Sequence, residues 1–137
     1  MHASAEEVPV VVRLDLAIDC ADPASLARFW AEALRYPATG IEVEPDNSDA
    51  VLEPPEAGLP RIYFQRVPEG KVAKNRIHLD LHTGGDTLEE KRPLIDAEAA
   101  RLVALGASDH RGPITEGGSY WMRMNDPEGN EFCLIGG

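Results

Sequence analysis

Residues 13–37, RLDLAIDCADPASLARFWAEALRYP, contain the pattern that decides the first part of the fold. Apolar and polar residues alternate up to Cys20, which predicts a strand with one buried face, and the apolar run before them extends this strand to 8–20. Asp22 then offers an N-cap oxygen, and Pro23 has the φ angle of a first helical position. Apolar residues recur at helical spacing until the next proline, so a helix follows the strand.

Three short strands are expected next. They lie at 40–44, 49–53 and 61–67, and turns rich in proline and polar residues separate them. The first half of the chain therefore has the order strand, helix and three strands.

The same order returns from residue 76. Strict alternation predicts a strand at 76–82, and Asp86 to Arg92 is expected to form a separate turn. The following helix has its start or a kink at Pro93 and its stop at Gly106. Its apolar stripe consists of Ile95, Ala99, Leu102 and Val103, and the three closing strands lie around His110, at 119–124 and at 131–135.

This repeat predicts an α+β fold of two βαβββ modules, at about 8–68 and 74–136, within one domain spanning 1–137. Residues 1–7 are polar and acidic, and we expect them to form a flexible arm. Two such modules can pair into a curved mixed sheet around a central cleft, where small ligands bind. Function is therefore expected on the inner surface of that cleft.

Composition restricts the partners. The 137 residues include 13 Lys and Arg against 24 Asp and Glu, a net charge of −11, which disfavours nucleic acids and anionic membranes. No apolar run approaches the roughly 20 residues of a membrane span, and the N-terminus lacks the features of a secretory signal. The two cysteines, Cys20 and Cys133, are expected to be small buried hydrophobes in a cytoplasmic protein.

Three motifs resemble those of a known superfamily. Residues 126–133, DPEGNEFC, are similar to the turn before the last strand of the glyoxalase/bleomycin resistance/dioxygenase, or vicinal oxygen chelate (VOC), proteins. Asp22 with Phe29 and Trp30 resembles the start of their first helix, and residues 74–81, KNRIHLDL, resemble the subgroup called glyoxalase-like domains. The resemblance implies the VOC fold with its cleft, but no single substrate or reaction.

The resemblance also implies where a metal would bind. The three ligand positions of metal-using relatives correspond here to Asp15, His78 and Cys133, with Glu131 two residues before the last of these. Asp15, His78 and either Cys133 or Glu131 could hold a divalent ion, although this set differs from the usual His/His/Glu. The cofactor is thus either absent or a divalent metal.

Acid–base chemistry without a metal is an alternative. His78, Asp80 and His82 project from one side of their predicted strand, which is either a cleft surface or an ordinary solvent-facing side; we favour the cleft for His78 and solvent for His82. Asp15 is equally well explained as an exposed strand residue. If it lies beside His78, the two could form a catalytic proton-transfer pair.

Further residues are candidates for ligand binding. They are Tyr63, Gln65, Arg76, Asp80, Trp121 and Glu131. Arg76 and Lys74 could clamp an anionic group or could be surface charges, whereas Phe29 and Trp30 lie on the apolar stripe of the first helix and are expected in the core.

The sequence therefore predicts a protein that binds a small molecule in its cleft, with metal-independent acid–base catalysis as one activity. One alternative is a divalent-metal lyase, isomerase or dioxygenase with atypical ligands. Another is a resistance protein that sequesters a drug. A homodimer is expected as well, because sheet edges need cover.

Overall fold

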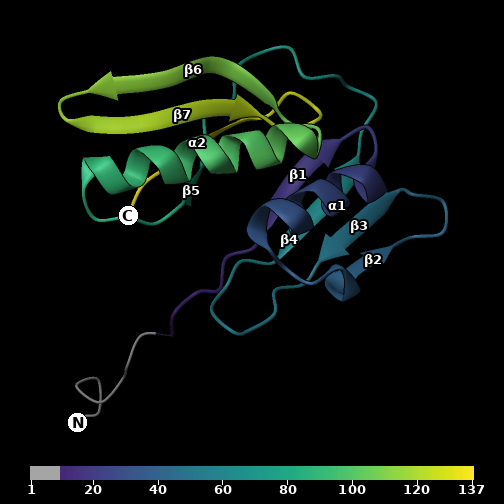
Figure 1. Ribbon diagram of the computed structural model, residues 1–137. Helices are drawn as coiled ribbons and strands as arrows, with labels where there is room; N and C mark the ends of the chain where they lie inside the picture. The colour runs from purple at the N-terminus through teal and green to yellow at the C-terminus, as the bar shows by residue number, and fades with distance from the viewer. Residues whose placement is uncertain (1–9) are drawn as a thin grey trace, which may run out of the picture.

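The chain forms two βαβββ modules, which confirms the predicted α+β fold (Figure 1). The computed structural model describes residues 10–137, and only the backbone of His110 and Arg111. The first module contains β1 (Leu16–Cys20), α1 (Pro23–Leu34), a 3-10 turn η2 (Ala38–Gly40), β2 (Ile41–Val43), β3 (Asp49–Leu52) and β4 (Ile62–Arg66). The second contains β5 (Leu79–His82), α2 (Leu88–Ala104), β6 (Ser108–Glu116), β7 (Ser119–Asn125) and β8 (Glu131–Ile135).

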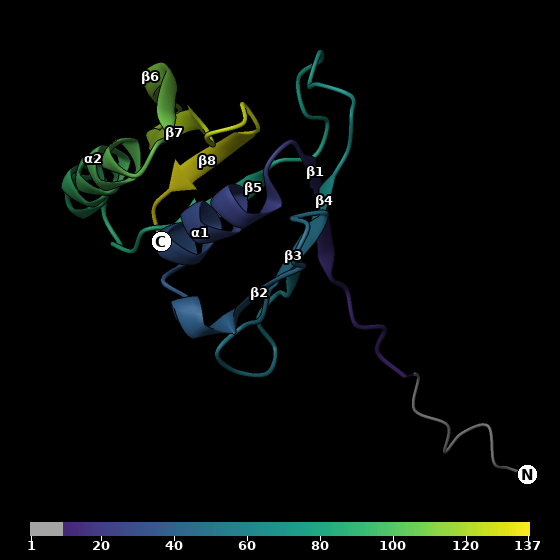
Figure 2. The ribbon, with the colours of Figure 1, turned by 90° about the vertical axis from the view of Figure 1, so that its right-hand side faces the viewer.

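Each module has its own four-stranded mixed sheet. The first sheet has the order β1-β4-β3-β2 and the second β5-β8-β7-β6. β1 runs parallel to β4, and β5 runs parallel to β8, while the other neighbours are antiparallel. β1 and β5 therefore occupy equivalent edge positions. α1 lies between the two sheets, so the other face of the first sheet points away from the second sheet (Figure 2).

The first and fifth strands are shorter than predicted. β1 begins at Leu16, which pairs with Ile62 at the start of β4, so residues 10–15 have no strand beside them. Val10 and Val12 of this segment are 89% and 87% exposed. β5 likewise begins three residues after the predicted start at residue 76. Residues 1–7, the expected flexible arm, and residues 8–9 of the predicted strand lie outside the described part of the chain.

The second helix differs from the prediction at its start. Thr87 and Glu90 form a capping box, so α2 begins at Leu88 and the separate turn predicted at 86–92 is wrong. The helix continues through Pro93, which lacks only one backbone N–H donor. Val103 is exposed and not part of the stripe, whereas the other three predicted stripe residues are buried. No helix within residues 10–137 combines the length and apolarity needed to cross a membrane.

Aromatic and polar contacts join the modules. Phe29 and Trp30 of α1 are buried, as predicted, and Phe132 of β8 packs edge-on to Trp30 with ring centroids 5.2 Å apart. At the other end of α1, the guanidinium of Arg101 from α2 donates to the carbonyl oxygens of Glu32 and Ala33 (3.0 and 3.2 Å). The two modules therefore share one core. Both cysteines are buried and free, as expected for small hydrophobes.

The turn at 126–130 locks the second module onto the first. The carboxylate of Asp126, only 2% exposed, accepts hydrogen bonds from Trp30 Nε1 (3.1 Å), from the Nδ2 of Asn130 (2.9 Å), and from the backbone N–H groups of Glu128 and Asn130 (2.9 Å each). The carboxylate of Glu128 accepts from the N–H groups of Ala21 and Asp22 (2.7 and 2.9 Å). The turn thus holds both the middle of α1 and the chain just before it.

Asp126→Ala should lower the free energy of unfolding by about 3 kcal/mol or more, because it leaves the buried Trp30 N–H and three further donors without an acceptor. Urea unfolding would measure the change. Glu56→Ala, at an exposed loop position, is the control and should stay within about 0.5 kcal/mol of wild type. A loss below about 1 kcal/mol in Asp126→Ala would show that the turn does not join the modules.

Candidate functional site

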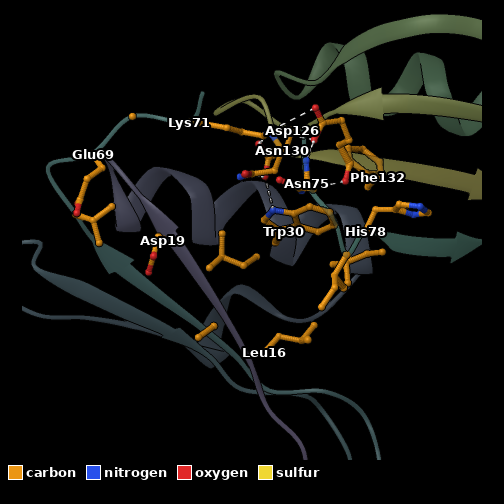
Figure 3. A pocket seen from close by; sticks show the side chains of 17 residues that line it. Leu16, Asp19, Trp30, Glu69, Lys71, Asn75, His78, Asp126, Asn130 and Phe132 are labelled. Carbon is orange, nitrogen blue, oxygen red and sulfur yellow. Dashed lines mark hydrogen bonds and ion pairs between the residues drawn. The ribbon is translucent and has the colours of Figure 1, made fainter. Parts of the chain in front are cut away.

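A cavity of about 630 Å³ lies between the modules; we call it the intermodule cavity (Figure 3). Its apolar lining includes Leu16 and Ile18 of β1, Trp30 of α1, Ile77, Leu79 and Phe132. Both modules contribute walls, so the cavity exists only because the 126–130 turn and the aromatic contacts hold them together. Its size suits a small organic molecule.

Polar groups lie around this apolar wall. In Figure 3, Asp19 and Glu69 lie at one end of the cavity and His78 at the other, with Lys71 and Asn75 above. Of these, only His78 was predicted as a site residue. Asp19 alternates with apolar residues as any exposed strand residue does, and Glu69, Lys71 and Asn75 lie in an irregular loop, so nothing in the sequence distinguishes them. Trp30 was predicted only as core.

The loop at 67–78 forms a wall of the cavity and is held by Glu131. The carboxylate of Glu131 accepts from the backbone N–H of Asn75 (2.9 Å) and pairs with Lys71 Nζ (3.1 Å). Burial by itself would raise the pKa of Glu131, but these hydrogen bonds outweigh it and lower the pKa from 4.5 to about 2. Glu131, predicted to bind a ligand, thus fastens the loop in this structure.

His78 at the cavity mouth also belongs to a cluster of possible metal ligands. Its Nδ1 lies 3.5 Å from Oδ1 of Asp80, and ligand atoms of His78, Asp80 and Cys133 all lie within 4.8 Å of one another. Asp80 pairs with Cys133 across β5 and β8, so their side chains share one face of the second sheet. Burial raises the pKa of the Cys133 thiol, although a hydrogen bond with Arg123 opposes this.

Sheet register places two more candidates on this face. His82 in β5 pairs with Ile135 in β8, and Ile135 pairs with Trp121 in β7. The side chains of His82 and Trp121 therefore lie on the same face of the sheet as those of Asp80 and Cys133. Trp121 lines a second, smaller pocket of about 310 Å³. Arg76 is exposed in the 67–78 loop. Asp80 and His82 thus lie on the same face, as the alternation predicts, but neither lines the intermodule cavity.

The remaining candidates lie in the first sheet or, for Asp15, just before it. Asp15 pairs with Arg13 (3.4 Å) and Arg61 (3.7 Å), and Arg61 stacks over the ring of Tyr63. Tyr63 and Gln65 face away from α1, on the side that points away from the second sheet. The hypothetical pair of Asp15 with His78 is not formed among the described residues, because Asp15 pairs with Arg13 and Arg61 while Asp80 lies beside His78.

Comparison with known proteins assigns the family. A sequence model described as Glyoxalase-like domain matches residues 15–135. The chain belongs to this family, and so to the VOC superfamily. Of the solved structures, FosX, the genomically encoded fosfomycin resistance protein from Listeria monocytogenes, is similar with a TM-score of 0.64 and 14% identity, covering 94% of this chain and 95% of that one.

Two further structures share the fold. A mutant of the same FosX, complexed with Mn(II) and dihydroxypropylphosphonic acid, has a TM-score of 0.63 and 15% identity over 92% and 90% of the two chains. A glyoxalase/bleomycin resistance protein/dioxygenase family enzyme from Burkholderia phytofirmans has a TM-score of 0.58 and 19% identity over 88% and 94%. No curated protein matches the sequence. At these identities the likeness establishes the fold of the glyoxalase-like chain.

Glu131→Gln should lower the free energy of unfolding at pH 7 by about 1 to 3 kcal/mol, since a charged acceptor of two hydrogen bonds is lost. The folded pKa of Glu131 is depressed, so its contribution is complete above about pH 4.5 and disappears as the pH falls toward about 2. Urea unfolding of wild type and Glu131→Gln at several pH values in this range would measure how the stability difference depends on pH. A difference that is independent of pH would contradict the assignment, and Glu116→Gln is the exposed control.

Proposed function

We propose that this glyoxalase-like protein binds a small organic molecule in the intermodule cavity and that His78 exchanges a proton with it. The observation that supports this is the position of His78, which lines the cavity and has a carboxylate, Asp80, 3.5 Å from its Nδ1. Histidine is the side chain most often used as a general acid or base.

Each group would have a separate task. Asp80 orients the imidazole through Nδ1, which leaves the other ring nitrogen available to a ligand. The apolar wall excludes water from the bound molecule, and a proton moves between that ring nitrogen and an acidic or basic atom of the ligand. The 67–78 loop, fastened by Glu131, closes the cavity on one side.

Wild type and His78→Gln should both bind the same ligand, but only wild type should convert it. A library of small organic molecules would be screened by thermal unfolding, where a ligand at 100 times its Kd adds about 2.7 kcal/mol. Mass spectrometry would then follow conversion of each stabilising molecule. His82→Gln, at the far end of β5, is the matched control and should remain active.

The outcome separates the alternatives. A ligand that binds wild type tightly and is recovered unchanged would support sequestration in place of catalysis. Conversion that persists in His78→Gln would remove His78 from the mechanism.

A metal-dependent reaction is the second candidate, supported by the cluster of His78, Asp80 and Cys133. Nitrogen, oxygen and sulfur donors within 4.8 Å of one another fit a zinc-like divalent ion. Asp80 would replace Asp15 in the ligand set predicted from the sequence, and Cys133 would have to lose its proton on binding. Such an ion, when bound, would supply a Lewis acid at the cavity mouth.

If this second function holds, Zn²⁺ added to chelator-treated protein should raise the Tm by several degrees at pH 7.5. His78→Ala and Cys133→Ala should abolish the rise, because each removes a ligand, while His82→Ala should keep it. Absence of a rise with Zn²⁺, Mn²⁺, Ni²⁺ or Fe²⁺ would favour the metal-free mechanism. If Asp15→Ala abolishes the rise in Tm and Asp80→Ala does not, the ligand would be Asp15, as the sequence predicted, and not Asp80.

Among residues 10–137 no strand pairs with the outer edges of β1 and β5, which favours a homodimer. Exposed apolar residues precede both edges: Val10, Val11, Val12 and Leu14 before β1, and Ile77 before β5. The edges are equivalent in the module repeat, so a twofold axis can pair β1 of one copy with β5 of the other. Light scattering should show a dimer, and Val10→Asp with Val12→Asp should yield a monomer; a monomeric wild type would refute this arrangement.

A further inference from the structure

The carboxylate and lysine side chains that line the intermodule cavity are either paired or not directed into it. Lys71 pairs with Glu131, and the carboxylate of Asp126 is satisfied by four N–H donors. Asp19 lies on the face of the first sheet that points away from α1, and Glu69 is an exposed loop residue at one end of the cavity (Figure 3). Because an unpaired charge is costly to bury, the part of a ligand that enters the cavity is expected to be uncharged.

Two amide side chains in the cavity wall, those of Asn75 and Asn130, are held in a fixed orientation. The Nδ2 of Asn130 donates to the Asp126 carboxylate (2.9 Å), and the Nδ2 of Asn75 donates to the backbone carbonyl of Glu131 (3.5 Å). An ionised carboxylate and a carbonyl can only accept, so these contacts determine which end of each amide is the nitrogen. The Oδ1 atoms of Asn75 and Asn130 therefore lie on the other side of each amide group.

Both amide oxygens are open acceptors. Among residues 10–137 neither Oδ1 has a hydrogen-bond partner, and neither is closed off from solvent, as the unpaired Oδ1 of Asn125 is. Asn75 comes from the 67–78 loop and Asn130 from the turn before β8, and both lie above Trp30 in the view of Figure 3. A ligand in the cavity can therefore donate an N–H or O–H group to them, whereas a ligand with acceptors alone would place oxygen against oxygen.

The rest of the cavity is suited to an apolar body. Leu16, Ile18 and Leu79 pack against the core, yet they remain partly exposed where they line the cavity. Contact with a ligand would remove this apolar surface from water. The ring of Trp30 adds an aromatic surface to the same wall.

We infer that the ligand is an uncharged, largely apolar molecule that carries N–H or O–H donors, such as a carboxamide, and that Asn75 and Asn130 select it. The donors pair with the two amide oxygens, and the apolar body packs against Leu16, Ile18 and Leu79. Asn75 and Asn130 determine specificity and transfer no proton. This inference rests on the proposed function, since it assumes that the intermodule cavity is the binding site.

Three probes that share one ring system test the preference for a donor: naphthamide offers N–H groups, methyl naphthoate only acceptors, and naphthoate a negative charge. In calorimetric titration of wild type, naphthamide should bind about 10-fold more tightly than the ester, because it alone can donate to the amide oxygens. Naphthoate should bind most weakly, because its charge finds no free partner in the cavity.

Substitution of the two amides should reduce this preference. Asn75→Leu and Asn130→Leu each remove one acceptor and should leave ester binding no weaker than in wild type. The backbone N–H of residue 75 still donates to Glu131 in Asn75→Leu, so the loop is retained; Asn130→Leu loses a donor to Asp126, and Asn75→Leu alone decides if that variant does not fold. Gln65→Leu, the same change at an exposed amide outside the cavity, is the matched control and should keep the full preference.

A variant that fills the cavity separates this inference from the proposed site. Ile18→Trp should abolish binding of all three probes, and Leu16→Trp replaces it if the unfolding curve of Ile18→Trp shows that the fold is lost. Equal binding of amide and ester, or a preference that is unchanged in Asn75→Leu, would overturn the selection by the amides; if Ile18→Trp abolishes that binding, the cavity stays the site. Binding that survives in the filled variant, or no binding of any probe, would overturn the inference together with the cavity as the site.

Discussion

The buried carboxylate of Asp126 is the interaction on which the rest of the structure depends. Burying a charge without partners would cost several kcal/mol, and four N–H donors offset this cost. Three of the donors belong to the turn itself and one, Trp30, belongs to the other module. The same carboxylate therefore stabilises its own turn and joins the two modules. The turn leads directly into β8, and its position therefore fixes Glu131, Phe132 and Cys133 relative to α1.

The cavity follows from this constraint. Its walls come from β1, α1 and β8, and from a loop without secondary structure that Glu131 attaches to β8. A wall built on such a loop depends on a few polar contacts, whereas the opposite wall is the shared core. The contacts that stabilise the fold and those that shape the cavity wall therefore come from the same strand.

His78 connects the two chemical possibilities of the site. It lines the cavity and also lies beside Asp80 and Cys133 on the open face of the second sheet. Asp80 and Cys133 themselves lie on the face of this sheet opposite to Leu79 and Phe132, so of these three residues His78 is the one that also lines the cavity. Both uses require the same side chain at the same place, and neither requires Asp15, which pairs with Arg61 on the other sheet.

The sequence by itself determined the order of the elements, the face on which Asp80 and His82 lie and the family, because periodicity, caps and turn motifs are local. Only the tertiary structure decided which residues meet. It placed Asp80 beside His78 and paired Asp15 with Arg61, and it left residues 10–15 without a neighbouring strand, because β4 begins only at Ile62. The cavity residues Asp19, Glu69 and Lys71 carry no local pattern, since their role arises from the packing of two modules that are distant in sequence.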